Sequence, residues 1–272
     1  MTHSLARGGR GVSLASPLYG SLIANYEMTR GRVTEATALI RARMAELQRF
    51  EQSDQIRRQL ALSDAATDLR VAGRAGTVTR ALLNETGARL QRMIAEAPED
   101  QRASLRQRAA RPMLVASAAL GDTATARSWR TVVSPDSLLA LEAAAVAAAG
   151  DRQRAARLFE RAARDTASDA DNLFALGVTA EAIGRPVDAL GYYNQLDSLY
   201  VEPGSSASTD WLLFVRTLAR RGGVAAQLGD TALARKSYDE FLTLWSHPDA
   251  ELLPERNAVA RRRAELDQPR RD

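Results

Sequence analysis

The sequence predicts an all-α protein, and three observations carry this prediction. The 272-residue chain contains 51 alanines against 17 glycines and 9 prolines, and alanine is the residue that costs a helix least. Apolar residues recur with helical spacing along most of the chain, whereas no alternation typical of strands runs for more than a few residues. Aromatic residues make up 5 % of the chain, so its core must be built from small side chains packed closely between helices.

The helical segments follow one another in order, separated by short glycine, aspartate, serine or proline signals. The spacing predicts helices at 17–29, 32–51, 54–73, 77–96, 99–119, 123–132, 136–149, 151–165, 169–183, 186–200, 208–228, 230–245 and 249–266. Ser53-Asp54, Ser134-Pro135-Asp136 and Ser168-Asp169 fit helix starts, since their side-chain oxygens can accept from first-turn amides. Pro112 falls inside the segment 99–119, where it predicts a kink or a break into two helices.

Six glycines fall between paired segments, and an alanine follows each of them five residues later. The pairs are Gly31/Ala36, Gly76/Ala81, Gly121/Ala126, Gly150/Ala155, Gly184/Ala189 and Gly229/Ala234. Gly177 and Gly222 lie seven residues before a turn glycine, and Phe159, Tyr193 and Tyr238 lie nine residues after one. This pattern predicts helical hairpins: small residues let the paired backbones approach, glycine permits the reversal, and the aromatic side chain fills the gap to the next hairpin.

On these residues the chain resembles the tetratricopeptide repeat family. The resemblance over 136–266 is carried by Leu176, Gly177, Gly184, Ala189 and Tyr193, by Gly150, Ala155, Phe159 and Ala162 before them, and by Gly222, Gly229, Ala234 and Tyr238 after them. Residues 17–51 resemble a degenerate copy through Tyr26, Gly31, Glu35 and Ala36. Between 54 and 132 the likeness is weak, because Glu85 and Arg130 stand where the aromatic residue is expected.

The resemblance implies a right-handed superhelical solenoid of antiparallel helix hairpins. We accordingly divide the chain into a flexible lead-in at 1–16, a degenerate helical-repeat region at 17–135, tetratricopeptide-like repeats with a C-terminal capping helix at 136–266, and a tail at 267–272.

The composition argues against catalysis and against a bound metal or cofactor. The chain has no cysteine and two histidines, His3 and His247, which are too few for a histidine-based metal site. It contains no phosphate-binding glycine loop and no nucleophile elbow. We therefore expect a protein without enzyme activity. The absence of a signal-peptide pattern and of a membrane-spanning apolar run predicts a cytoplasmic location.

Arginine dominates the charge, since Lys236 is the single lysine among 37 basic residues and the net charge is +4. A high-GC codon bias explains this composition better than nucleic-acid binding. The cluster Arg261–Arg263 is diluted by Glu265, Asp267 and Asp272 and lacks aromatic stacking residues, which disfavours a nucleic-acid partner.

In the tetratricopeptide repeat family the first helix of each hairpin lines a concave face, which implies candidate binding residues here. They are Ala144, Phe174, Val178, Glu181, Arg216 and Gln227. The lining is largely apolar, so the resemblance implies a protein-interaction scaffold that binds a peptide or helix in this groove. The lysine and asparagine clamp of the family's chaperone-tail binders cannot be assembled with one lysine. The segment 138–149 is apolar except at Glu142, and it fits a helix sandwiched between hairpins better than a partner-facing surface.

A second hypothesis comes from the end of the chain. Residues 238–252 resemble the closing repeat in helical tails of bacterial multidomain signalling proteins, including serine/threonine kinases and transcriptional activators. This likeness implies a regulatory or sensor tail, acting within one protein or in a dimer, whose catalytic or DNA-binding domain is not in this chain.

Overall fold

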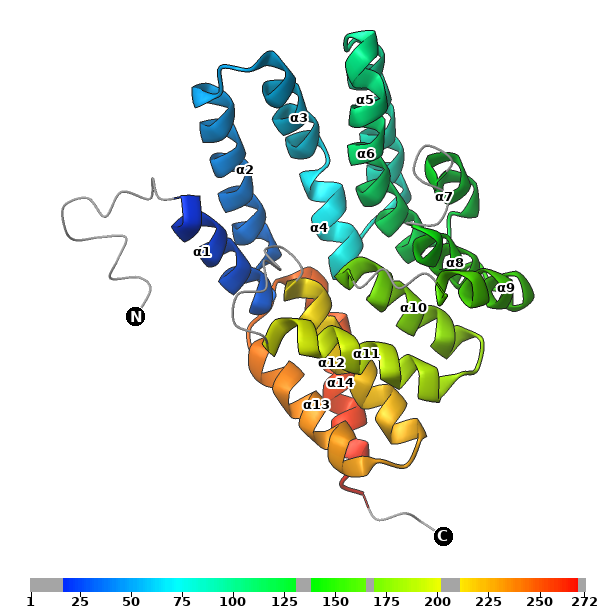
Figure 1. The fold of residues 1–272 in the computed structure, drawn as a ribbon. Coiled ribbons are helices and arrows are strands. Elements are labelled where there is room, and N and C mark those ends of the chain that lie inside the picture. Colours follow the sequence, from blue (N-terminus) through cyan, green and yellow to red (C-terminus); the bar gives the residue numbers. More distant parts are fainter. Residues whose placement is uncertain (1–16, 131–137, 165–168, 202–210, 269–272) are drawn as a thin grey trace, which may run out of the picture.

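A computed structural model describes residues 17–130, 138–164, 169–201 and 211–268, and all regular structure in these ranges is helical (Figure 1). The helices are α1 (Pro17–Thr29), α2 (Val33–Phe50), α3 (Asp54–Ala65), α4 (Thr67–Ala75), α5 (Arg80–Ala95), α6 (Glu99–Leu120), α7 (Thr123–Arg130), α8 (Leu139–Ala148), α9 (Arg152–Ala162), α10 (Ala170–Ala182), α11 (Pro186–Val201), α12 (Trp211–Gln227), α13 (Thr231–Leu244) and α14 (Leu253–Glu265), with a short 3-10 turn, η2 (Ala250–Leu252), before α14. The predicted all-α class is confirmed for these ranges. The lead-in 1–16 and the helix start at Ser134-Pro135-Asp136 lie outside them.

The six predicted turn glycines all adopt the left-handed conformation, with φ between 67° and 88°. Each joins two helices that contact one another, which gives the pairs α1–α2, α4–α5, α6–α7, α8–α9, α10–α11 and α12–α13. Of the six paired alanines, five are fully buried at 0 % exposure, namely Ala36, Ala126, Ala155, Ala189 and Ala234. The hairpin packing inferred from glycine and alanine spacing is confirmed at these five positions.

Ala81 is the exception, because it is exposed. In the other pairs the second helix begins two residues after the turn glycine, but α5 begins at Arg80, four residues after Gly76. This longer connection moves the buried position two residues along the chain. Leu83, the fourth residue of α5, is 1 % exposed and takes the inward place that alanine holds in the other pairs.

Two predicted helix boundaries differ from the structure. The segment predicted at 54–73 is divided at Ala66, which leaves the helical path with ψ near −2° and separates α3 from α4. Pro112 does not break its segment, because α6 runs without interruption from Glu99 to Leu120. A proline inside a helix costs about 3 kcal/mol. Pro112 and its neighbours Met113 and Leu114 are buried, so tertiary packing outweighs that cost.

The helix α8 is enclosed by its neighbours, as predicted for the apolar segment 138–149. Residues 139–147 are buried, and α8 contacts α6, α7, α9 and α10. Its one charged residue, Glu142, is 2 % exposed and pairs with Arg130 of α7 and with Arg154 of α9, the latter at 3.0 Å. Arg130 therefore stands in the place of the expected aromatic residue because it neutralises a buried carboxylate.

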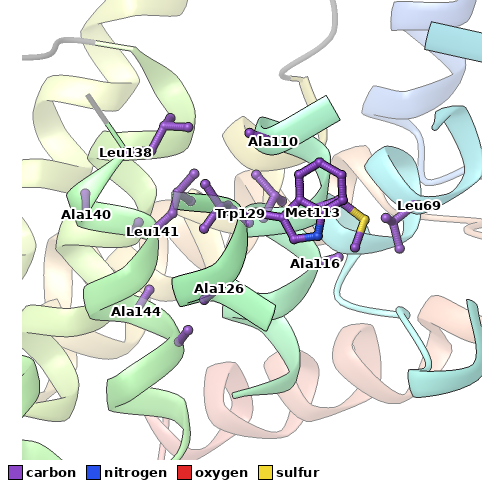
Figure 2. Packing of buried hydrophobic residues seen from close by; sticks show 14 of the residues in the cluster. Leu69, Ala110, Met113, Ala116, Ala126, Trp129, Leu138, Ala140, Leu141 and Ala144 are labelled. Atoms are coloured by element: carbon purple, nitrogen blue, oxygen red, sulfur yellow. The ribbon is translucent and has the colours of Figure 1, made fainter. Parts of the chain in front are cut away.

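Five of the six first helices contact one another in a closed circuit. α4 packs on α6, α6 on α8, α8 on α10, α10 on α12, and α12 on α4. The larger hydrophobic core lies along this circuit, and Figure 2 shows the part where Leu69 of α4, Met113 of α6, Trp129 of α7 and Leu141 of α8 meet. The five helices α4, α6, α8, α10 and α12 thereby face a common interior.

A second core joins the two ends of the described chain. Met28 and Val33 of the first hairpin pack in one cluster with Leu212 of α12, Trp245 after α13 and Leu252 of η2. The first hairpin is also hydrogen-bonded at this junction. Asp249 Oδ2 accepts from the backbone N–H and the hydroxyl of Thr34, both at 2.8 Å. Asp249 thus caps α2 from 215 residues away in sequence, where Arg32 at the N-cap supplies no side-chain bond.

Candidate functional site

Four of the six predicted binding residues line one cavity in the interior of the circuit. Ala144, Phe174, Val178 and Arg216 surround a space of about 190 Å³, to which α4, α6, α8, α10 and α12 all contribute. Phe174 and Val178 are half-buried. The structure therefore brings these four residues together because each lies on the inward face of a first helix.

The other two predicted residues, Glu181 and Gln227, lie at a separate hollow of about 430 Å³ beside Tyr238 and Arg262. Glu181 accepts a hydrogen bond from the Tyr193 hydroxyl and lies 3.5 Å from the Arg220 guanidinium. Burial raises the pKa of Tyr193 well above its ordinary value, and the negative charge of Glu181 raises it further. Glu181 thus ties α10 to α11 and α12.

Arg216 closes one side of the 190 Å³ cavity. Its Nη1 donates to the carbonyl oxygen of Arg74 at 2.8 Å, and its Nε donates to Glu255 at 3.3 Å. Its guanidinium also stacks over the Phe174 ring, 5.5 Å from the ring centroid. These contacts hold Arg216 between α4, α10 and α14. Ligand sites usually enclose about 300–1,000 Å³, so a cavity of 190 Å³ fits one inserted apolar side chain.

A larger hollow of about 670 Å³ lies beside this cavity between α3, α4, α6 and the start of α10. Four arginines line it, two from α4 and two from α6: Arg70, Arg74, Arg108 and Arg111. The α6 contribution follows helical spacing at 104, 107, 108, 111, 112 and 115, which places these residues on one face. Val115 and Asp171 line both hollows, so the two spaces are neighbours.

A partly buried ion-pair network is centred on Asp171, which lines both hollows. Arg74 donates from Nε to Asp171 Oδ1 at 3.0 Å and from Nη2 to Oδ2 at 2.8 Å. Arg111 donates from Nη1 to Asp171 Oδ2 at 3.2 Å and from Nη1 to Asp169 Oδ1 at 2.9 Å. Asp169 also caps α10 by accepting from the Asn172 N–H at 3.0 Å. The network therefore fixes the start of α10 against α4 and α6.

Opposing effects act on the pKa of Asp171. Burial disfavours its charged form, but the neighbouring guanidinium groups of Arg74 and Arg111 outweigh burial and lower the pKa below its ordinary value. Burial likewise opposes the charge of Arg111, whose pKa is nevertheless raised by Asp169 and Asp171. Asp171 and Arg111 are therefore both ionised at neutral pH, and their charges stabilise one another.

The arginine-lined hollow is not among the sites predicted from the sequence. The signal that could have indicated it is the polar face of α6, where Ser104, Gln107, Arg108 and Arg111 recur at helical spacing. The two arginines of α4 that complete the hollow lie more than thirty residues earlier in the chain, and only the packing of α4 on α6 brings them opposite that face.

The described residues contain no group of three or more histidine, cysteine, aspartate or glutamate side chains that could hold a metal ion. No helix in the described ranges is both long enough and apolar enough to cross a membrane. No protein-family model and no curated protein matches the chain.

Proposed function

We propose that the protein is a non-enzymatic interaction module of the tetratricopeptide repeat type, a right-handed solenoid of hairpins that binds a protein or peptide segment on its first-helix face. One observation carries the proposal. Residues of five first helices, which belong to five different hairpins, converge on a single cavity. A face built from successive hairpins is the usual binding surface of repeat proteins.

The local packing supports the repeat assignment. An added Cβ at Gly177 would lie 2.3 Å from the Tyr193 ring, and one at Gly222 would lie 2.5 Å from the Tyr238 ring. Each glycine therefore leaves room for the aromatic residue of the second helix in its own hairpin. The same arrangement occurs in α10–α11 and in α12–α13, which is what a structural repeat requires.

Phe174 and Val178 are the residues through which a partner side chain would be held. Both line the 190 Å³ cavity and both remain half-buried. An apolar side chain inserted there would bury the exposed parts of Phe174 and Val178, at roughly 25 cal/mol per Å² of apolar surface. The cavity therefore selects partner segments that carry a large apolar anchor residue.

The test is peptide selection by display on the intact protein, followed by affinity measurement with the selected peptides. We expect Val178→Arg to weaken binding by about tenfold or more, because a charged side chain would occupy the cavity. Val187→Arg is the matched control, since Val187 is 70 % exposed on α11 and does not line the cavity. Phe174→Ala is a second variant that shortens a half-buried side chain, and circular dichroism checks the folding of all three.

Two results would contradict the proposal. In the first, selected peptides bind the Val178→Arg and Phe174→Ala variants as tightly as the original protein. In the second, Val187→Arg weakens binding as much as Val178→Arg, which would place the contact surface outside the first-helix face.

A regulatory tail of a bacterial signalling protein is the second candidate function, and exposed apolar residues favour it. Leu47, Phe50 and Ile56, near the turn between α2 and α3, are 36 %, 73 % and 43 % exposed. Large exposed apolar side chains often mark surfaces that contact another protein. Light scattering on the protein and on its Phe50→Glu variant tests this role. A dimeric protein whose Phe50→Glu variant is monomeric would support this role. A protein that is monomeric both with and without the substitution would oppose it.

A further inference from the structure

We propose that the arginine-lined hollow binds the carboxylates of an acidic protein segment. This inference rests on the proposed function, because it names the chemistry of the partner that the module would bind. Its starting observation is that Arg70 and Arg74 of α4 face the same space as Arg108 and Arg111 of α6. Two guanidinium groups on each of two packed helices thus surround one hollow.

The described side chains that line the hollow carry four positive charges and one negative charge. Arg74 and Arg111 are matched by the carboxylates of Asp171 and Asp169. Arg70 also lines the hollow and donates from Nη2 to the Thr67 hydroxyl at 3.4 Å. Arg108 is exposed and forms no ion pair with any other residue that the structure describes. The lining therefore attracts anions, and Arg108 presents a guanidinium that an incoming carboxylate can reach.

The shape and lining of the hollow favour a peptide as the source of that carboxylate. Its volume of about 670 Å³ falls in the range of sites that enclose a ligand, and it greatly exceeds the size of one carboxylate. Ser63, Ser104 and Gln107 offer uncharged hydrogen-bonding groups, whereas the apolar lining residues Leu62, Pro112 and Leu138 are buried. Such hydrogen-bonding groups suit the backbone of a polypeptide.

Two features of the described lining favour a carboxylate ligand over nucleic acid, namely the geometry of arginine and the lack of aromatic residues. A guanidinium group matches a carboxylate through two parallel hydrogen bonds. Sequence-independent binding of single-stranded nucleic acid relies on aromatic side chains that stack on the bases. No aromatic residue lines the hollow among the residues described. The adjacent apolar cavity shares Val115 and Asp171 with this hollow.

The experiment measures binding of a fluorescein-labelled poly-glutamate peptide to the full chain by fluorescence anisotropy. Arg108→Glu is the test variant and Arg106→Glu is its control. Both residues are exposed on α6, both substitutions change the net charge equally, and Arg106 lines a different hollow beside Trp129. We expect Arg108→Glu to weaken binding by about tenfold or more, since it removes a charge-assisted contact and adds a repulsive charge. Arg106→Glu should weaken binding less than about twofold.

Competition with inorganic phosphate and with a single-stranded oligonucleotide identifies the ligand class. The inference predicts that the acidic peptide remains bound at concentrations of phosphate that supply the same number of charges, and that the oligonucleotide competes weakly. Equal losses in Arg108→Glu and Arg106→Glu would overturn it, because binding would then follow the overall charge. Displacement of the peptide by the oligonucleotide with the same dependence on Arg108 would also overturn it, in favour of nucleic-acid binding.

The Val178→Arg variant separates this inference from the proposed function. If display-selected peptides bind Val178→Arg as tightly as the original protein while Arg108→Glu weakens poly-glutamate binding, the proposed apolar binding face is refuted and the acidic-segment site is retained. If Val178→Arg weakens binding of the selected peptides while Arg108→Glu leaves poly-glutamate binding unchanged, the inference about acidic segments is refuted and the proposed function is retained.

Discussion

Asp171 is 4 % exposed, and its carboxylate accepts hydrogen bonds from arginines of two different helices. Replacing both members of a buried ion pair by apolar residues often costs little stability. Removing one member alone leaves an uncompensated buried charge. The energetic consequence of a substitution here depends on which member of the network is changed.

We expect Asp171→Asn to lower the free energy of unfolding by about 3–5 kcal/mol, since Arg74 would keep a buried charge without its carboxylate. The double variant Arg74→Leu/Asp171→Leu removes both charges and should recover most of that loss, because Arg111 retains Asp169. Urea denaturation of the original protein and both variants measures the difference. Equal destabilisation by the single and double variants would show that the ion pair is not the cause.

Acid should weaken the fold through the same residue. The pKa of Asp171 is lower in the folded protein than its ordinary value, which is about 3.9 for an unfolded chain. Its stabilising contribution is therefore complete above that unfolded value and is lost as the pH falls below it toward the folded pKa. Between about pH 5 and pH 3 the melting temperature should fall more steeply for the original protein than for Asp171→Asn. Parallel curves would contradict this assignment.

At the scale of elements, the contact between a glycine and an aromatic ring sets the spacing within a hairpin. Gly222 and Gly223 are neighbours in α12 but differ in the space beside them. An added Cβ at Gly222 would lie 2.5 Å from a ring atom of Tyr238, whereas one at Gly223 would have its nearest neighbour, the Tyr238 hydroxyl, at 3.6 Å. Tyr238 is 1 % exposed, so its ring is packed among neighbouring residues.

We expect Gly222→Ala to destabilise the protein by about 1–3 kcal/mol, as overpacking in a core does. Gly223→Ala should instead be neutral or stabilising by up to about 1 kcal/mol, because alanine is the better helix former. Thermal denaturation of the two variants provides the comparison. A stabilising Gly222→Ala would show that Tyr238 can move aside and that the hairpin spacing does not depend on this glycine.

Sequence patterns predicted the hairpins because their determinants are local. A turn glycine, the alanine five residues later and the helical spacing between them all act within one hairpin, and the six glycines behave as expected. The exposure of Ala81 departs from this pattern because the connection before α5 is longer. The uninterrupted helix at Pro112 could not be predicted locally, because the burial of α6 depends on residues far away in sequence.

Part of the candidate site follows from patterns within single hairpins, and part depends on contacts between helices far apart in sequence. The shared cavity lining of Ala144, Phe174, Val178 and Arg216 agrees with the inward face that the family resemblance implies for first helices. Their role in binding stays a prediction. The arginine-lined hollow could not be predicted, because it requires α4, α6 and the start of α10 to meet. Glu181 lies at a separate hollow and contacts Tyr193 and Arg220, partners that helical periodicity does not reveal.

At the scale of the whole molecule, contacts between the first hairpin and the residues around Asp249 close the structure. Besides the Asp249 cap, the Gly31 carbonyl accepts from the Asp249 N–H at 2.9 Å. A Cβ added at Gly31 would lie 2.7 Å from the Cβ of Pro248, and the φ of 74° there also requires glycine. The junction thus combines a cap, a backbone hydrogen bond and a close backbone approach.

We expect Asp249→Ala to cost about 0.5–2 kcal/mol, as loss of a helix cap does, and to loosen a hairpin distant in sequence. Hydrogen exchange should accelerate in α1 and α2 and leave α8 unchanged. Asp230→Ala is the matched control, because Asp230 caps its own helix α13 by accepting from the Leu233 N–H at 3.0 Å. Its effect should remain in α13. Faster exchange confined to residues near 249 in the Asp249→Ala variant would refute a coupling across the junction.

The closure also imposes a delay on the chain as it is made. The first hairpin is synthesised before Asp249, which follows Thr34 by 215 residues, and at about 5–20 residues per second this interval takes roughly 10–40 s. During that interval Met28 and Val33 lack the apolar partners that α12, α13 and η2 later supply. The first hairpin is therefore completed long after its own synthesis, and a chain that stops before residue 249 lacks the Asp249 cap on α2.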